Sequence, residues 1–226
     1  YLDGQGAEKD IQKAVALFTL AATKENSFAA FALGKLYLAG DAALPRDPAA
    51  ALKWLTYAAE LGNQFAQYRL GKLLLKGDDG IPKDVITAIR WLTAAAKQEN
   101  GYAEYALALV YLTGEDAPKD SVKALSLLKR SAGRGNQFAQ YRLGKLLLQG
   151  EDAPKDVKAA IRWLTAAAEQ GNQYAQYALG KLYLLGKEVP KDRSSAIKWF
   201  QLAADQGNEY AQYFLKHMDD RLGQPP

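Results

Sequence analysis

The most regular chemistry-bearing pattern in this chain combines aromatic rings with lysine ammonium groups. Six segments each hold two aromatic residues three positions apart, and in four of them a lysine follows the second ring by four positions. On a helix such residues share one face. The candidate partner-binding residues are Phe28, Phe31, Lys35, Phe65, Tyr68, Lys72, Tyr102, Tyr105, Phe138, Tyr141, Lys145, Tyr174, Tyr177, Lys181, Tyr210 and Tyr213.

The sequence leaves two interpretations of this stripe open. In the first, the rings pack between neighbouring helices and the lysines only solvate them. In the second, rings and ammonium groups bind an extended or helical peptide that carries carboxylates, because rings give a large contact area at low entropic cost. Rings beside lysines also stack single-stranded nucleic acid, but such grooves usually carry more arginine and net charge. We rank nucleic acid well below peptide binding.

The composition agrees with that ranking. The 226 residues carry a formal net charge of +4, and the basic residues are interleaved with acidic ones, which favours an ordinary solvated surface. A hydrophobic share of 49% is typical of a globular protein. No apolar run approaches the roughly 18–20 residues that a membrane-spanning helix needs, so we expect no membrane partner.

Residues for catalysis or metal binding are scarce. The chain has no cysteine and a single histidine, His217, which we interpret as a surface residue of the last helix. Acidic pairs such as Glu115-Asp116 and Glu151-Asp152 lack the alternating spacing of a calcium loop, so we interpret them as solvated turns. Every glycine stands at a helix stop or a packing point, not in a phosphate-binding loop. We predict no enzyme, no cofactor, no metal site and no small-molecule substrate.

The elements that position the stripe form a repeat. The stretch GNQFAQYRLGKLLL occurs at 62–75 and again, unchanged, at 135–148, and the alanine inside it recurs every 36 or 37 residues from Ala29 to Ala211. Each unit shows two segments of helical periodicity. We predict an all-α chain of about twelve helices, with second helices near 47–61, 84–98, 120–134, 156–170 and 192–206.

Fixed positions in each unit predict where helices begin and end. One aspartate per unit caps the second helix, and one asparagine opens the first; these are Asp10, Asp47, Asp84, Asp120, Asp156 and Asp192, with Asn26, Asn63, Asn100, Asn136, Asn172 and Asn208. Glycine closes four second helices. Glu25 and Glu99 replace it in two units, where we expect a different or mildly strained turn.

Small and large residues predict how the units pack. Gly34, Gly71, Gly144 and Gly180, with Ala108 in the remaining unit, should let a neighbouring helix approach closely. Four tryptophans share one position of the second helix with Leu17 and Leu127, which favours core packing; they are Trp54, Trp91, Trp163 and Trp199.

The pattern A-x-x-x-L-G-x-x-Y-x-x-G, followed by Pro-Lys-Asp and A-x-x-W-x-x-x-A-A-x-x-G-N, resembles the Sel1-like repeat, a relative of the tetratricopeptide repeat. This resemblance implies a right-handed α-α superhelical solenoid of about six helix pairs, with first helices lining a concave face. It also implies an adaptor or scaffold that binds another protein, so we expect the aromatic and lysine stripe to lie on that face.

The ends of the chain carry further expectations. Residues 1–4 match the tail of a first helix, so we expect a single solenoid over 1–226 that begins within a repeat. Lys216 and Asp219 replace the packing glycine and tyrosine, which predicts a capping helix over 208–222. The segment QYAQYALGKLYLLGKEVPKD is similar to Sel1-type tails of bacterial mobile-element relaxases, so the alternative function is a C-terminal interaction appendage of a larger bacterial enzyme. The absence of cysteine favours the cytoplasm.

Overall fold

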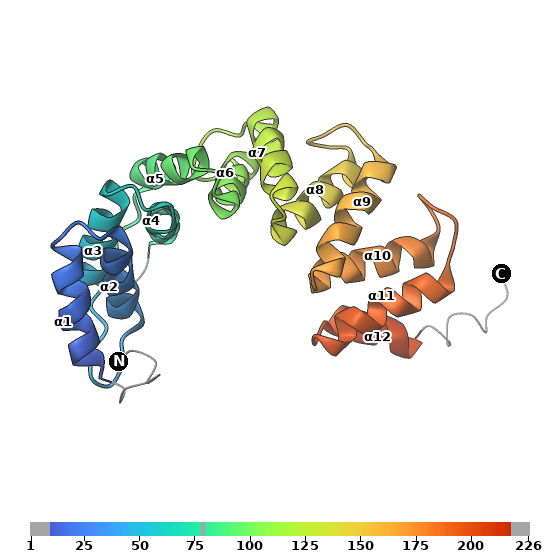
Figure 1. The fold of residues 1–226 in the computed structure, drawn as a ribbon. Helices are drawn as coiled ribbons and strands as arrows, with labels where there is room; N and C mark the ends of the chain where they lie inside the picture. Colours follow the sequence, from blue (N-terminus) through green and yellow to red (C-terminus); the bar gives the residue numbers. More distant parts are fainter. Residues whose placement is uncertain (1–9, 78–79, 218–226) are drawn as a thin grey trace. The chain divides into compact units, whose positions relative to one another are not determined.

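The structure, a computed structural model, describes residues 10–77 and 80–217, and this part of the chain is all helical (Figure 1). The helices are α1 (Ile11–Ala22), α2 (Ser27–Ala39), α3 (Pro48–Glu60), α4 (Gln64–Lys76), α5 (Val85–Lys97), α6 (Gly101–Thr113), α7 (Ser121–Gly133), α8 (Gln137–Gln149), α9 (Val157–Glu169), α10 (Gln173–Leu185), α11 (Arg193–Asp205) and α12 (Glu209–His217). Twelve helices and no strand in the described residues confirm the predicted fold class and helix count.

The predicted capping residues open the helices. Asp84 accepts a hydrogen bond from the backbone N–H of Thr87 at the start of α5, and the five equivalent aspartates do the same for their helices. Asn63 accepts from the backbone N–H groups of Phe65 and Ala66 at the start of α4. All six asparagines cap in this way. A free N–H of the first turn is therefore satisfied in every described helix.

The two glutamates at helix stops adopt the conformation of the glycines that they replace. Glu25 and Glu99 have φ angles of 61° and 64°, in the left-handed region that glycine favours. Asn26 N–H donates to the carbonyl of Ala21, as Asn63 N–H donates to Ala58 after Gly62. The turn is thus closed in the same way, and the cost is a strained non-glycine backbone. Of the two expected alternatives, a different closure or mild strain, the φ angles agree with strain.

Close approach of paired helices depends on the predicted glycines. A Cβ atom at Gly71 would lie 2.6 Å from Cγ of Leu92, and one at Gly144 would lie 2.7 Å from Cγ of Leu164. Gly34 and Gly180 meet Leu55 and Phe200 at similar distances. These contacts hold α4 on α5, α8 on α9, and the other two pairs in the same register. The packing function assigned to these glycines is confirmed.

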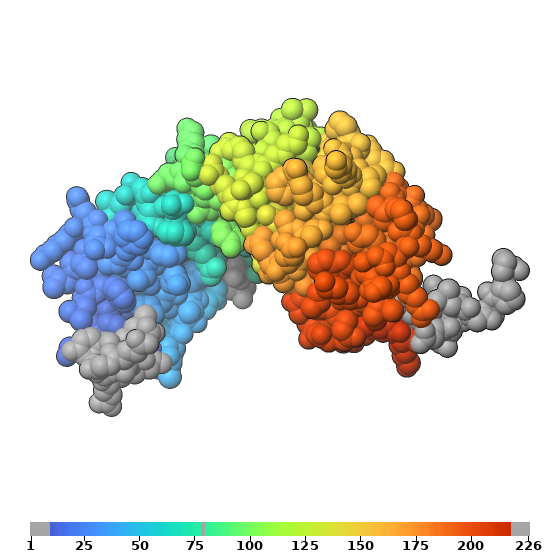
Figure 2. Space-filling model, turned by 45° about the vertical axis from the view of Figure 1, so that its right-hand side comes forward, coloured from blue at the N-terminus to red at the C-terminus, as the bar shows by residue number. Residues whose placement is uncertain are grey.

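The helices form two compact units, Tyr1–Lys119 and Asp120–Pro226. In the first, α2 packs on α3 and α4 on α5; in the second, α8 packs on α9 and α10 on α11. Figure 2 shows the described side chains of each unit closely packed. The core of each helix pair is a buried leucine or phenylalanine of the second helix set among the small residues of both, such as Leu92 with Ala95 and Ala96. The predicted capping helix is described only as α12, since Asp219 and the rest lie outside the described residues, as do residues 1–4.

The tryptophans lie at the edge of the core, not within it. Trp54, Trp91 and Trp199 are half-buried and pack one side against the buried clusters, while the neighbouring Leu55, Leu92 and Phe200 take the fully buried position. A cation one residue earlier stands over each indole: the Nζ of Lys53 lies 5.7 Å from the Trp54 centroid. The predicted core packing is therefore found on one side of Trp54, Trp91 and Trp199, and the other side of each ring is not part of the core.

Buried glutamines join successive repeats, a feature that the sequence analysis missed. Gln140 donates from Nε2 to the carbonyl of Ala132 at 3.1 Å, and Gln170 donates to Oε1 of Gln140 at 2.7 Å. Gln176 forms the same pair of bonds with Ala168 and Gln206, at 3.0 and 2.8 Å. Each amide therefore satisfies a carbonyl at the end of the preceding second helix and accepts from the end of the following second helix, which ties each first helix to the second helices on both sides.

Candidate partner-binding site

The stripe residues form a ladder of ring contacts between successive first helices. The second ring of one helix meets the first ring of the next: Phe31 contacts Phe65 with a centroid distance of 6.4 Å, and Tyr68 contacts Tyr102 at 5.9 Å. In the second unit Tyr141 contacts Tyr174 at 6.0 Å and Tyr177 contacts Tyr210 at 5.9 Å. Such contacts stabilise the stacking of helices by about 0.5–1.5 kcal/mol each beyond the buried area. Packing between first helices, the first of the two interpretations, is therefore part of what the rings do.

Exposure divides the rings into two classes. The first ring of each helix is exposed, from 44% for Phe138 to 71% for Tyr210, whereas the second ring is half-buried in every helix except α12. Packing alone does not require so much exposed aromatic surface. Within each unit the rings consequently present apolar surface to solvent as well as to each other.

Lysines cover the half-buried rings. The Nζ atoms of Lys35, Lys72 and Lys145 lie 5.7, 5.8 and 5.8 Å from the centroids of Phe31, Tyr68 and Tyr141, four residues earlier. This distance permits cation–π attraction. The ammonium groups are therefore held near the rings.

Ring burial changes the chemistry of two phenols. Burial, and to a smaller extent the neighbouring Tyr102, raises the pKa of Tyr68 above its ordinary value, against the opposing effect of Arg69. Burial followed by Tyr210 raises the pKa of Tyr177. Both phenols stay neutral at physiological pH, so the charge on the stripe comes from its lysines.

In the second unit the stripe opens into a pocket between α8 and α10. Its volume is about 320 Å³, and Tyr141, Lys145, Tyr177 and Lys181 line it together with Leu148, Gln149, Ala178, Leu182, Leu185, Lys187 and Glu188. Four predicted stripe residues thus meet around one cavity. The last three residues of the lining lie beyond the stripe, and the sequence analysis did not single them out.

The electrostatics of this pocket are one-sided. Lys145, Lys181 and Lys187 form no ion pair within the described residues, whereas the single acidic residue of the lining, Glu188, is bound at 2.8 Å by the Nζ of Lys155. The pocket therefore combines apolar walls with three ammonium groups available to a ligand.

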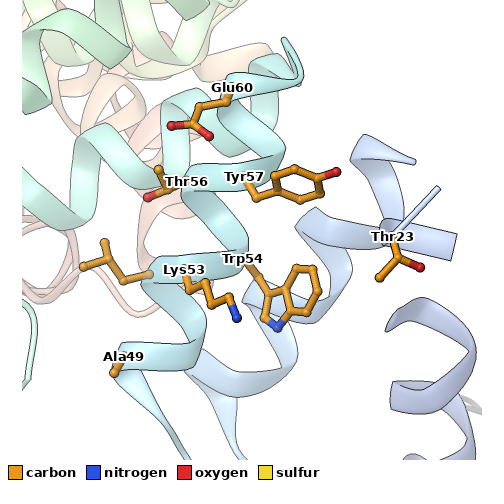
Figure 3. A pocket seen from close by; sticks show the side chains of 8 residues that line it. Thr23, Ala49, Lys53, Trp54, Thr56, Tyr57 and Glu60 are labelled. Carbon is orange, nitrogen blue, oxygen red and sulfur yellow. The ribbon is translucent and has the colours of Figure 1, made fainter. Parts of the chain in front are cut away.

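A second depression lies in the first unit, between α3 and the end of α1 (Figure 3). It has a volume of about 790 Å³ and is lined by Trp54, Tyr57, Leu52, Lys53, Glu60, Ala49, Thr56 and Thr23. The Trp54 and Tyr57 rings meet edge to face, with centroids 6.2 Å apart. Its lining has one basic residue, Lys53, and one acidic residue, Glu60, so it favours neither sign of ligand charge.

One family matches nearly the whole chain. The Sel1 repeat matches six successive segments, residues 1–26, 27–63, 64–100, 101–136, 137–172 and 173–208. The chain belongs to the Sel1 repeat family. The five Sel1 segments from residue 27 onward each begin at a first helix and contain the second helix that follows it.

Solved structures of other Sel1 repeat proteins are similar to this chain. A protective antigen present in uropathogenic Escherichia coli strains is 34% identical, with a TM-score of 0.87 over 99% of this chain and 48% of that protein. A Sel1 repeat protein from Oxalobacter formigenes is 33% identical, with a TM-score of 0.86 over 96% of this chain and 63% of that protein. The chain thus spans less than two thirds of either relative. No protein with a curated description matches it.

Sel1 repeat proteins are generally non-catalytic scaffolds for protein interaction. In the described residues no group of three or more potential metal-binding side chains occurs. His217 is half-buried, with its ring stacked on Tyr213 at 4.2 Å. None of the described helices is long and apolar enough to cross a membrane.

The acidic loop residues of the Sel1 repeats have a structural task. Asp116 forms an ion pair with Lys83 of the preceding repeat, with 2.6 Å between Oδ1 and Nζ. Asp152 accepts a hydrogen bond from the hydroxyl group of Ser121 at 2.7 Å. The sequence alone predicts solvated turns at these positions. The correction is that two of them link neighbouring repeats, because the loops that follow successive first helices lie side by side.

Proposed function

We propose that this chain is a non-catalytic interaction module that binds a segment of another protein along the stripe of its first helices. The observation that carries this proposal is the pocket between α8 and α10, where two tyrosines and two lysines of the stripe surround one cavity. The exposed rings that continue from it supply area for a longer segment. The relaxase-appendage alternative stays a prediction.

A partner of this stripe should carry carboxylates. The lysines lie on one side of the rings at helical spacing, so they can pair with acidic residues of a bound segment. Rings with half of their surface already packed lose little conformational entropy on binding. Both properties favour a peptide over a small polar ligand.

Affinity capture from a lysate of the cells that produce the protein tests this function. The stripe variant Lys145→Glu/Lys181→Glu should lose the captured partners, because two attractive charges become repulsive. The matched control Lys129→Glu/Lys158→Glu makes the same charge change at exposed positions of α7 and α9 and should keep them. Equal capture by parent, stripe variant and control would contradict the proposal.

A further inference from the structure

The pocket between α8 and α10 is lined at three positions by residues that differ from those of the two duplicated segments. These are Ala178, Leu185 and Lys187, and all three line the pocket. From them we infer that this pocket is the specificity site of the module, and that it takes an apolar side chain of a partner peptide flanked by Asp or Glu. This inference rests on the proposed function and adds the chemistry of the partner.

The first difference makes room. At the position of Ala178, the two duplicated segments hold Arg69 and Arg142, whereas the repeats of α2 and α6 hold alanine as α10 does. A methyl group on α10 replaces a long guanidinium side chain, so the surface between α8 and α10 is left open above Leu182 and Leu148. The volume of about 320 Å³ is at the lower end of the roughly 300–1,000 Å³ typical of ligand pockets. It suits one or two side chains of a peptide.

The second difference makes the rim apolar. Leu185 stands where the duplicated segments hold Lys76 and Gln149, and 44% of its surface is exposed. The exposed part of this leucine contributes no hydrophobic free energy to folding, because that surface is not removed from water. With Leu148 and Leu182 it forms an apolar wall that a hydrophobic side chain of the partner would cover.

The third difference reverses a charge. Lys187 directly follows the glycine that ends α10, and the equivalent position holds Asp41, Asp78, Glu115 and Glu151 in the other units. Lys187 thus joins Lys145 and Lys181 around the cavity. The one acidic neighbour, Glu188, is bound to Lys155. Charge complementarity therefore selects a partner segment with carboxylates beside its apolar anchor.

Peptide selection on the whole chain tests this inference. A library of random heptapeptides displayed on phage is selected on immobilised protein, and the affinities of enriched peptides are measured by fluorescence anisotropy. The enriched peptides should carry Leu, Ile, Met or an aromatic residue next to at least one Asp or Glu. Their affinity should fall as salt is raised.

Variants that carry the residues of the duplicated segments separate the contributions of Ala178, Leu185 and Lys187. Lys187→Glu and Leu185→Gln introduce the residue types that the preceding repeat has at the equivalent positions, Glu151 and Gln149. The repeat therefore tolerates both changes. Each variant should bind the selected peptides with an affinity lower by about tenfold or more. Ala178→Arg, the residue of Arg142, should block the anchor side chain. The control Lys158→Glu, on α9, should keep the affinity within about twofold.

The outcomes distinguish this inference from the proposed function. Failure to enrich any peptide would contradict both. Enriched peptides without acidic residues, or peptides that bind the three pocket variants as tightly as the parent, would overturn only the inference. In that case the module would bind peptides through another part of the stripe.

Discussion

The Nζ of Lys145 lies 5.8 Å from the ring centroid of Tyr141, and the same ring contacts Tyr174 of the next repeat at 6.0 Å. One side chain thus takes part in stacking the helices and in forming the binding surface. Removal of the ring should affect both. The lysine and the exposed first rings are therefore the better positions for testing binding.

This dual placement gives the first prediction. Tyr141→Ala should lower the free energy of unfolding. Loss of a fully buried aromatic ring costs about 3–5 kcal/mol, and this value is the upper bound because the Tyr141 ring is only half-buried. Lys145→Gln should change it by no more than about 1 kcal/mol, because this half-buried lysine loses only its cation–π contact. Urea unfolding followed by circular dichroism measures both. Equal stability of Tyr141→Ala and the parent would show that the ring ladder does not hold the repeats together.

The close approach of α8 and α9 gives the second prediction. Gly144→Ala places a Cβ 2.7 Å from Cγ of Leu164, and such overpacking costs about 1–3 kcal/mol. The gain in helix propensity of about 1 kcal/mol offsets only part of this cost. Gly133→Ala is the matched control, because a Cβ there meets no atom within 4 Å. Thermal unfolding should show a lower Tm for the first variant and an equal or higher Tm for the second; the reverse order would refute the packing function of Gly144.

The strained turn at Glu99 gives the third prediction. A non-glycine residue in the left-handed region costs roughly 1–2 kcal/mol, so Glu99→Gly should stabilise the protein by about 1 kcal/mol after the entropic cost of glycine. Glu169→Gly, at the end of α9, lacks a positive φ and should destabilise it instead. Chemical denaturation distinguishes the two. A loss of stability in Glu99→Gly would mean that its side chain contributes more than the strain removes.

The buried glutamines give the fourth prediction. Gln140→Leu removes a donor from the carbonyl of Ala132 and an acceptor from the amide of Gln170, and an unsatisfied buried polar group costs about 1–3 kcal/mol. Gln149→Leu, at an exposed position of the same helix, is the control and should be near neutral. If the two variants unfold at the same urea concentration, the glutamine bonds do not stabilise the repeat stack.

The aspartate caps give a pH dependence. Hydrogen bonds from Thr87 lower the pKa of Asp84, and those from Ser195 lower the pKa of Asp192. A lowered folded pKa means that the caps contribute fully above the unfolded value of about 3.9, and that this contribution is lost as pH falls through the folded pKa. Asp84→Asn/Asp192→Asn keeps good capping residues that do not titrate. Its Tm should therefore fall less than that of the parent between pH 6 and pH 3; parallel falls would contradict this account.

The caps and close contacts of this fold follow from single residue types, which explains why the sequence predicts them. Asp84 caps α5 and Gly71 admits Leu92 because each needs only the local helix or its direct partner. The half-burial of Trp54 depends on how much of an indole the neighbouring repeat covers, and no periodicity encodes that amount. Position in the helical pattern alone therefore overstated its burial.

The candidate site shows the same division. Helical spacing placed Tyr141, Lys145, Tyr177 and Lys181 on one face, and the structure brings all four to one pocket. Lys187 and Leu185 escaped notice because they come from a loop and a helix end, whose positions depend on the following repeat. Comparison of equivalent positions between repeats would have found them, since Lys187 alone replaces an acidic residue there.

Site-specific photo-crosslinking tests the central claim, that a protein partner binds at the first-helix stripe, most directly. A benzophenone amino acid replaces Tyr174, a stripe residue of α10 that is 55% exposed, or Lys158, an exposed residue of α9. After irradiation in the cells that produce the protein, covalent adducts are detected by gel shift and identified by mass spectrometry. The account predicts a protein adduct from position 174 and none from position 158. An adduct from position 158 with none from position 174 would contradict it.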